Sequence, residues 1–325
     1  MKLTCRAFLR LSSVSAILSL GSRSVWAQAY PARPVRVLVG YAPGGVNDLL
    51  ARLIGQFLAE RLGQSFPVEN RPGAASNIAT EAVARAPADG YTLLLVGSAN
   101  AINTTLYDRL SFDFRKDIAP VATLCSVPIA LLVNPSVPVK TVPELIAYAK
   151  ANPGKLSMAS PGNGSPQHLA GELFKMMAGI DMVHIPYRGG GPALTDILAG
   201  QVQVFFGSVA SSIQYIRNGQ LRALAVTTPE RLDVLPDLPT IAEFLPGYTA
   251  VGWYGIGAPA GTPAAIVALL NREVNAGLAD PKIKARLADL GATALPGSPA
   301  DFGRLIAEET ERWAKVVRFS GAKAD

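Results

Sequence analysis

Residues 35–63 read VRVLVGYAPGGVNDLLARLIGQFLAERLG, and this stretch predicts a strand that turns into a helix. The strand is the β-branched run at 35–39, and the Ala-Pro-Gly-Gly sequence at 42–45 supplies the turn. Apolar residues then recur from Leu49 to Leu58 at the spacing of one helix face, and Gly63 is the expected helix end. A strand followed by a tight turn and a helix is the building unit of an α/β fold.

The same alternation of strand and helix continues along the chain. Apolar strands are predicted at 91–96, 156–159, 183–185, 202–206 and 221–226, with helices between them. Strands that are apolar at nearly every position are typical of parallel sheets covered by helices on both faces. Three closing helices are predicted at 263–278, 281–290 and 299–317. The sequence therefore predicts an α/β fold with mostly parallel sheets flanked by helices.

The first 29 residues have the features of a secretory signal peptide. Basic residues precede an apolar run at 11–20, and cleavage after Ala27 or Ala29 would follow small residues. The run is about half the roughly 20 residues that a membrane span needs. We therefore expect export to the periplasm. The general secretory route is favoured over the twin-arginine route, since Cys5 replaces one arginine of the twin-arginine pattern.

Removal of the signal peptide changes the charge and the cysteine content. The full chain has 30 basic and 24 acidic residues, and the segment before Tyr30 holds basic residues but no acidic one. The mature chain keeps 26 basic residues against 24 acidic ones. This balance gives no reason to expect binding to nucleic acid. Only Cys125 remains, so no internal disulfide is expected, and roughly 296 residues are enough for two domains.

Five loops after predicted strands share one chemistry. They are rich in Gly, Ser, Asn and Pro and lie at 42–48, 97–100, 160–165, 188–192 and 207–212. Ligands of α/β sheets bind at the ends of strands, where loops lead into helices. Glycine lets backbone N–H groups approach an anion, and each helix start adds partial positive charge. Arg188 is the only cation in these loops. We therefore expect them to hold a carboxylate mainly through main-chain amides.

Metal-dependent and catalytic alternatives have little support in the sequence. His168 and His184 have no second ligand at metal-binding spacing, so neither a metal nor a cofactor is expected. Ser165 is predicted to cap a helix that begins at Pro166, and it lacks the final glycine of a nucleophile elbow. An enzyme that uses Ser165 with His168, or Asp48, stays a minor alternative. The His168 side chain either lines the cleft or stabilises the start of its helix.

A series of short motifs then occurs in order along the mature chain. They are YPARP at 30–34, APGG at 42–45 with Asp48, VENRPGA at 68–74, DGYTL at 89–93, SPGNGS at 160–165, HLAGEL at 168–173, PYRG at 186–189, RALAV at 222–226 and APAGTP at 258–263. Together these motifs resemble the substrate-binding receptors of tripartite tricarboxylate transporters, known as the Bug family. The resemblance covers essentially the whole mature chain.

The resemblance implies a type II periplasmic-binding-protein fold, in which two lobes close over a ligand. The chain would cross between lobes near Cys125 and near Ala250. Lobe 1 would then combine residues 30–124 with 251–325, and lobe 2 would be residues 125–250. Such a receptor would be a monomer that captures a small organic carboxylate and delivers it to a membrane permease with a large and a small subunit. A receptor that feeds a signalling system without transport is the alternative.

The family also implies which residues bind the ligand, mainly through backbone amides and ordered water. The expected residues are Tyr41, Ala42, Gly44, Gly45 and Asp48 from lobe 1, Ser160, Gly162, Gly164, Ser165 and His168 from lobe 2, Ser98, Asn100 and Tyr187 beside them, and Gly207 and Ser208 after the 202–206 strand. Many relatives have aspartate after that strand, where this chain has Gly207-Ser208, and also where it has Gln203. An aspartate there could pair with an amino group, so its absence implies a carboxylate without an amino group.

Overall fold

The structure of the chain is a computed structural model that describes residues 30–320 and 322–324. The predicted signal peptide lies outside these residues, so its cleavage stays a prediction. The chain divides into residues 1–32 and a compact unit of residues 33–325, and the elements below belong to the second unit. Within the described part of the chain, no helix combines the length and the apolar character required to span a membrane.

The first sheet has the strand order β2-β1-β3-β9-β4, with β10 paired to β4. Its strands are β1 (Arg36–Val39), β2 (Val68–Asn70), β3 (Thr92–Gly97), β4 (Ile118–Val133), β9 (Val251–Pro259) and β10 (Thr293–Ala294). β1 is parallel to β2 and β3, which confirms the strands predicted at 35–39 and 91–96. β9 is antiparallel to both β3 and β4, so the sheet is mixed.

The second sheet continues from the far end of β4 in the order β4-β7-β5-β6. Its other strands are β5 (Ser157–Ser160), β6 (Val183–Pro186), β7 (Val204–Ser208) and β8 (Arg222–Val226). β5 is parallel to β6 and β7, as predicted. β8 pairs with β4 and is antiparallel to it, which differs from the parallel pairing expected for the 221–226 strand. Because β4 pairs with β9 along 118–128 and with β7 along 129–133, both sheets share this strand.

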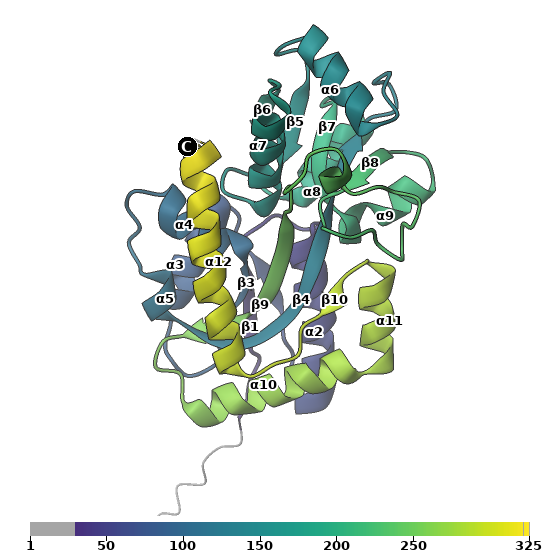
Figure 1. Cartoon of the computed structure of the whole chain (residues 1–325). Coiled ribbons are helices and arrows are strands. Elements are labelled where there is room, and N and C mark those ends of the chain that lie inside the picture. The colour runs from purple at the N-terminus through teal and green to yellow at the C-terminus, as the bar shows by residue number, and fades with distance from the viewer. Residues whose placement is uncertain (1–29, 321, 325) are drawn as a thin grey trace, which may run out of the picture. The chain divides into compact units, whose positions relative to one another are not determined.

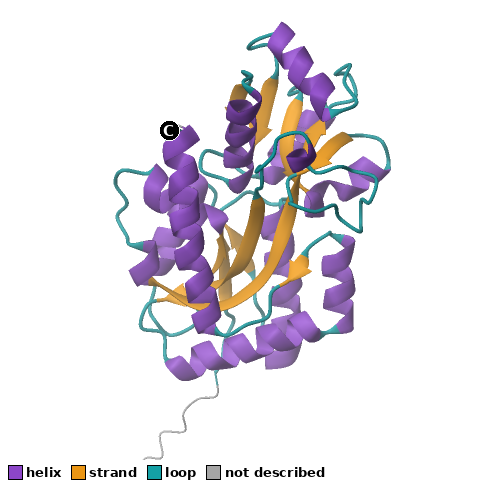
Figure 2. Cartoon of the chain, viewed as in Figure 1, coloured by secondary structure: helices purple, strands orange, loops and turns teal. Residues whose placement is uncertain are grey.

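Helices surround both sheets (Figures 1 and 2). They are α2 (Val46–Leu62), α3 (Asn77–Ala84), α4 (Ser98–Leu106), α5 (Phe114–Asp117), α6 (Val142–Ala151), α7 (Pro166–Ala178), α8 (Gly190–Leu198), α9 (Val209–Arg217), α10 (Ala264–Ala279), α11 (Pro281–Asp289) and α12 (Pro299–Ser320), with 3₁₀ turns at Ala74–Ser76 and Ile241–Glu243. Gly63 and Gly179 end α2 and α7 in the left-handed conformation, which confirms Gly63 as the helix end predicted from the sequence. The three predicted closing helices correspond to α10, α11 and α12.

Helix α12 packs against the cores of both sheets. Phe302 and Ile306 join the apolar cluster of the first sheet, whereas Trp313 lies in the cluster that contains the α7 residue Phe174. Glu309 lies between them and accepts hydrogen bonds from the indoles of Trp253, at 3.0 Å, and Trp313, at 2.8 Å. The two cores are therefore joined through α12 as well as through β4, and the boundaries of the two lobes stay a prediction.

Candidate functional site

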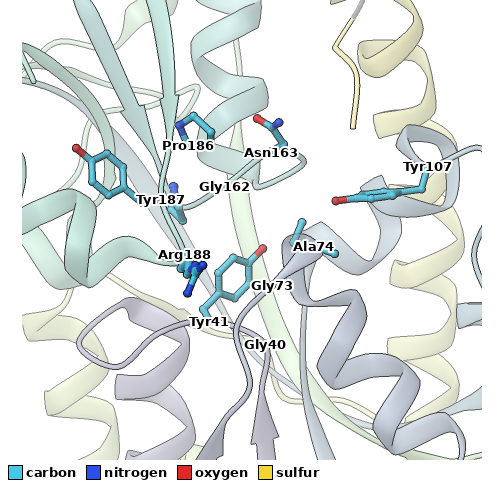
Figure 3. Close-up of a pocket in the computed structure, with 12 residues that line it drawn as sticks. Gly40, Tyr41, Gly73, Ala74, Tyr107, Gly162, Asn163, Pro186, Tyr187 and Arg188 are labelled. Atoms are coloured by element: carbon cyan, nitrogen blue, oxygen red, sulfur yellow. The ribbon is translucent and has the colours of Figure 1, made fainter. Parts of the chain in front are cut away.

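A cavity of about 220 Å³ lies where the loops of the two sheets meet. Three loops around it follow β1, β5 and β6; we call them the first loop (residues 40–45), the second loop (160–165) and the third loop (186–191). The lining residues are Gly40, Tyr41, Gly73, Ala74, Ala75, Tyr107, Pro161, Gly162, Asn163, Pro186, Tyr187 and Arg188 (Figure 3). The cavity therefore lies at the carboxyl ends of parallel strands, where α/β proteins bind ligands.

The first and third loops touch each other beside the cavity. The backbone N–H of Ala42 donates a hydrogen bond of 2.9 Å to the carbonyl oxygen of Arg188. Glycines of the third loop make this approach possible, because a Cβ would lie 2.3 Å from the carbonyl oxygen of Pro43 on Gly191 and 2.8 Å from the amide nitrogen of Ala42 on Gly189. Loops from the two sheets are thus in direct backbone contact.

Tyr41 brings a buried hydrogen-bond donor to the cavity. Its side chain is 6 % exposed, and its hydroxyl has no hydrogen-bond partner among the described residues. Figure 3 shows this hydroxyl pointing between the Gly73–Ala74 and Gly162–Asn163 segments. Burial raises the pKa of Tyr41 well above its ordinary value, so the hydroxyl stays protonated. A neutral phenol in this position can donate a hydrogen bond to an anionic oxygen.

A left-handed turn at residues 73–76 forms another wall of the cavity. Ala74, Ala75 and Ser76 have φ angles of 45°, 47° and 78°, although none of them is glycine. Such a conformation costs roughly 1–2 kcal/mol per residue. Asn103 of α4 holds the turn by donating a hydrogen bond of 2.8 Å to the carbonyl oxygen of Ala75. Strain of this kind concentrates at binding and active sites.

Asp48, a predicted ligand residue, turns toward the first loop. Its carboxylate accepts hydrogen bonds from the backbone N–H of Gly44 at 3.3 Å, from Arg52 at 2.8 and 3.0 Å, and from Asn70 at 3.0 Å. Asn70 also donates to the carbonyl oxygen of Tyr41. Burial opposes ionisation of Asp48, but these hydrogen bonds outweigh it and hold the pKa below its ordinary value. Asp48 is therefore a carboxylate that supports the loop.

His168 supports the second loop in the way that Asp48 supports the first loop. Its Nδ1 atom accepts a hydrogen bond of 3.1 Å from the backbone N–H of Gly164. Its own backbone N–H donates to the Ser165 hydroxyl, which confirms Ser165 as the cap of α7. The imidazole is 4 % exposed, and burial, with His184 and Lys175 nearby, lowers the pKa of His168 to about 3. His168 therefore supports the start of its helix and loop as a neutral ring.

The second histidine, His184 on β6, stacks on the ring of His168. Their ring centroids are 4.1 Å apart, and the planes differ by 15°. His184 Nε2 lies 2.7 Å from the Ser160 hydroxyl, which in turn accepts a hydrogen bond from the backbone N–H of Gly162. Burial, with Lys175 as a second cause, lowers the pKa of His184 to about 4. The pair is thus neutral at ordinary pH and contacts both ends of the second loop.

The remaining predicted site residues fall into three groups. Gly162 and Tyr187 line the cavity together with Tyr41. Ala42, Gly44 and Gly45 lie at the contact with the third loop. The others support neighbouring segments or lie outside the cavity lining. Ser98 accepts a hydrogen bond from the Trp253 backbone N–H, and Asn100 accepts from the Gly97 N–H and donates to the Thr80 hydroxyl. A Cβ on Gly207 would lie 2.8 Å from Leu132 and from Phe205, and the Ser208 hydroxyl is buried without a partner among the described residues.

The cavity also contains residues that the sequence did not single out. They are Gly40, Gly73, Ala74, Ala75, Tyr107, Pro161, Asn163 and Pro186. The sequence marks Arg188 as the single cation of the loops, and in the structure its guanidinium has no hydrogen bond or ion pair among the described residues. A Pro-Gly pair followed by small residues at 72–76 was the available signal for the left-handed turn. Among the described residues, no group of three or more His, Cys, Asp or Glu side chains could hold a metal ion.

Comparison with known proteins identifies the family and agrees with the fold. The model of the tripartite tricarboxylate transporter family receptors matches residues 50–321. BugT of Bordetella pertussis is 39 % identical over 302 residues, which cover 92 % of this chain and 93 % of BugT. The structure of Rpa4515 of R. palustris with adipate has a TM-score of 0.88 at 40 % identity and covers 90 % of this chain and 99 % of that one. MatC of Rhodopseudomonas palustris with bound malate has a TM-score of 0.85 at 35 % identity, over 89 % of this chain and 100 % of MatC.

Proposed function

The chain belongs to the tripartite tricarboxylate transporter receptor family, and from this premise we propose that it is a periplasmic receptor for a small carboxylate without an amino group. Its fold is that of the type II periplasmic-binding proteins, and its family is one of ligand-binding receptors rather than enzymes. The predicted signal peptide supports the periplasmic location.

The observation that carries the proposal is the chemistry of the cavity. Tyr41 offers a protonated hydroxyl and Arg188 a positive charge, and neither group has a partner among the described residues. No aspartate or glutamate is among the residues that line the cavity. A carboxylate would find donors there, whereas an ammonium group would be desolvated without a counter-charge. The lining therefore supports a carboxylate ligand and disfavours an amino acid.

We propose more specifically that the ligand is a dicarboxylate. Two similar receptors of known structure hold adipate and malate, which are both dicarboxylates without an amino group. The single cation of the lining can neutralise one carboxylate, and hydrogen-bond donors from Tyr41 and the loops can hold the other.

Closure of two lobes is the proposed mechanism of capture. A ligand that touches loops of both sheets stabilises the closed form more than the open form, and this difference shifts the population. The backbone contact between Ala42 and Arg188 is of the kind that such closure would form. The closed receptor would then be recognised by a permease with a large and a small subunit.

Calorimetry on refolded, ligand-free protein tests the ligand class. We expect one-to-one binding of adipate, malate or a related dicarboxylate, and no measurable binding of aspartate or glutamate. A screen of candidate carboxylates by melting temperature comes first. A ligand that binds only the folded state raises the melting temperature of the protein. Tight binding of aspartate or glutamate, with no plain carboxylate bound, would refute the proposal.

Uptake of the identified carboxylate in a strain that lacks the receptor tests delivery. Loss of uptake, restored by the intact chain, supports transport. Unchanged uptake together with a lost transcriptional response to the ligand would favour the sensing alternative.

A further inference from the structure

The first and second loops, which come from different sheets, are built in the same way around a glycine. Gly44 and Gly164 both have positive φ angles, 85° and 77°. Each backbone N–H donates to the side chain four residues later, from Gly44 to Asp48 Oδ2 at 3.3 Å and from Gly164 to His168 Nδ1 at 3.1 Å. Asp48 lies in the first turn of α2 and His168 in the first turn of α7, the helices that follow the first and second loops.

Each acceptor is buried and is held by a second side chain that also reaches the start of its loop. Asp48 is 5 % exposed and His168 4 %. Asn70 donates to Asp48 and to the carbonyl oxygen of Tyr41. His184 correspondingly stacks on His168 and hydrogen-bonds to the Ser160 hydroxyl. Both loops are therefore held at two points by side chains that are not among the residues lining the cavity.

We propose that Asp48 and His168 are positioning residues, which hold the first and second loops in the shape that receives the ligand but do not contact the ligand themselves. The inference rests on the proposed function, because it assumes that these loops bind a carboxylate. Holding the loops in advance reduces the entropy that is lost when the ligand orders them. The N–H groups of Gly44 and Gly164 are used within the loops, so the ligand is met by Tyr41, Gly162 and their neighbours in the lining.

Asp48 and His168 must be in different protonation states to accept these hydrogen bonds. Asp48 must be ionised to hold Arg52 and Asn70 together with Gly44. His168 must be neutral, since only an unprotonated Nδ1 can accept from Gly164. The proton of its ring then lies on Nε2, which is 3.9 Å from a carboxylate oxygen of Glu172.

Paired variants at position 168 test the inference. Asparagine places an acceptor close to the position of Nδ1, whereas leucine removes it. We expect His168→Leu to weaken dicarboxylate binding about tenfold in calorimetry, and His168→Asn to recover most of this loss. Phe174→Leu is the control, because Phe174 is fully buried on the same helix and lies outside the loop and the cavity lining. It should lower the melting temperature and leave the affinity unchanged.

Hydrogen exchange of the ligand-free protein gives a readout that does not depend on the ligand. We expect amides of residues 160–165 to exchange faster in His168→Leu than in the parent, and to be unchanged in Phe174→Leu. Parent-like affinity and exchange in His168→Leu, or equal losses in the leucine and asparagine variants, would overturn the inference. If the parent binds none of the carboxylates, the proposed function fails and exchange alone decides the positioning role. If His168→Leu does not fold, His168→Ala, which also removes the Nδ1 acceptor, is compared with His168→Asn by exchange at residues 160–165, with the same outcomes expected.

Discussion

The backbone of Ala42 is hydrogen-bonded to the backbone of Arg188, with 2.9 Å between the amide nitrogen and the carbonyl oxygen. These residues follow β1 and β6, so the bond connects loops of different sheets. The third loop contains three consecutive glycines at 189–191, and a Cβ on Gly189 would lie only 2.8 Å from the amide nitrogen of Ala42. We therefore expect closure to be sensitive to a single added methyl group on this loop.

Gly191→Ala is expected to weaken carboxylate binding by at least tenfold. The new Cβ would lie 2.3 Å from the carbonyl oxygen of Pro43, closer than two such atoms can approach. An open form separates these loops and would tolerate the methyl group, so the substitution penalises the closed form selectively. Calorimetry measures the loss, and the melting temperature of ligand-free protein should change little.

Gly190→Ala is the matched control for this prediction. Its Cβ would be 3.6 Å from Gly45 Cα and 4.0 Å from the Pro161 ring, which are ordinary contacts. We expect affinity within about twofold of the parent, because ordinary contacts cost little free energy. Equal affinity in the two variants would show that the loops need not meet for binding.

Arg188→Gln is expected to reduce affinity for dicarboxylates about tenfold. The guanidinium is the only positive side chain in the cavity lining and has no partner among the described residues. A charge-assisted hydrogen bond contributes roughly 1.5–3 kcal/mol, and exposure to solvent reduces this value. The loss should shrink as salt is added. Arg217→Gln, on the exposed part of α9 and outside this lining, removes the same charge and should bind like the parent.

The sequence predicted the strand–turn–helix units of the fold but not β4 and β9, the two longest strands. The βα units at 35–63 and 156–179 are set by apolar spacing, caps and terminal glycines, which are all local signals. The strands β4 and β9 are not of this kind. Pro120 and Pro128 interrupt the strand pattern of β4, and glycines at 252, 255 and 257 weaken that of β9. Their pairing joins segments more than a hundred residues apart, which no local pattern can report.

The candidate site was predictable to a similar extent. Loop composition and the resemblance identified Tyr41, Gly162 and Tyr187, which line the cavity. They did not determine where a side chain points, and Asp48 and His168 turn to their own loops. The turn at 73–76 was missed, since Ala and Ser favour negative φ and the observed turn is held by Asn103 from a later helix.

Acidification from pH 7 to pH 5 is expected to destabilise the protein through its two histidines. Burial lowers the pKa of His168 to about 3 and of His184 to about 4, whereas an unfolded histidine titrates near pH 6.5. The unfolded state therefore binds more protons in this window, so the stabilisation is complete above about pH 6.5 and is lost as the pH falls toward the folded pKa values. Each histidine should lower the free energy of unfolding by about 1–2 kcal/mol.

Urea denaturation at the two pH values measures this loss. His168 and His184 are the only histidines of the chain, so no other imidazole contributes. In His184→Gln the loss should fall to about half, since one titrating group remains. A loss of the same size in this variant would assign the pH dependence to other groups.

Ala74→Gly is expected to leave the free energy of unfolding unchanged or to raise it by up to about 1 kcal/mol. An alanine-to-glycine change usually costs about 0.5–1 kcal/mol, because glycine has more freedom in the unfolded chain. Ala74 is exposed and has a φ of 45°, so glycine instead relieves roughly 1–2 kcal/mol of left-handed strain without loss of buried surface. Ala268→Gly, at an exposed position within α10, should show the ordinary loss in the same urea experiment. If both variants lost the same free energy, the turn at 73–76 would hold no strain, and its unusual backbone would have to arise from a conformation that alanine adopts without cost.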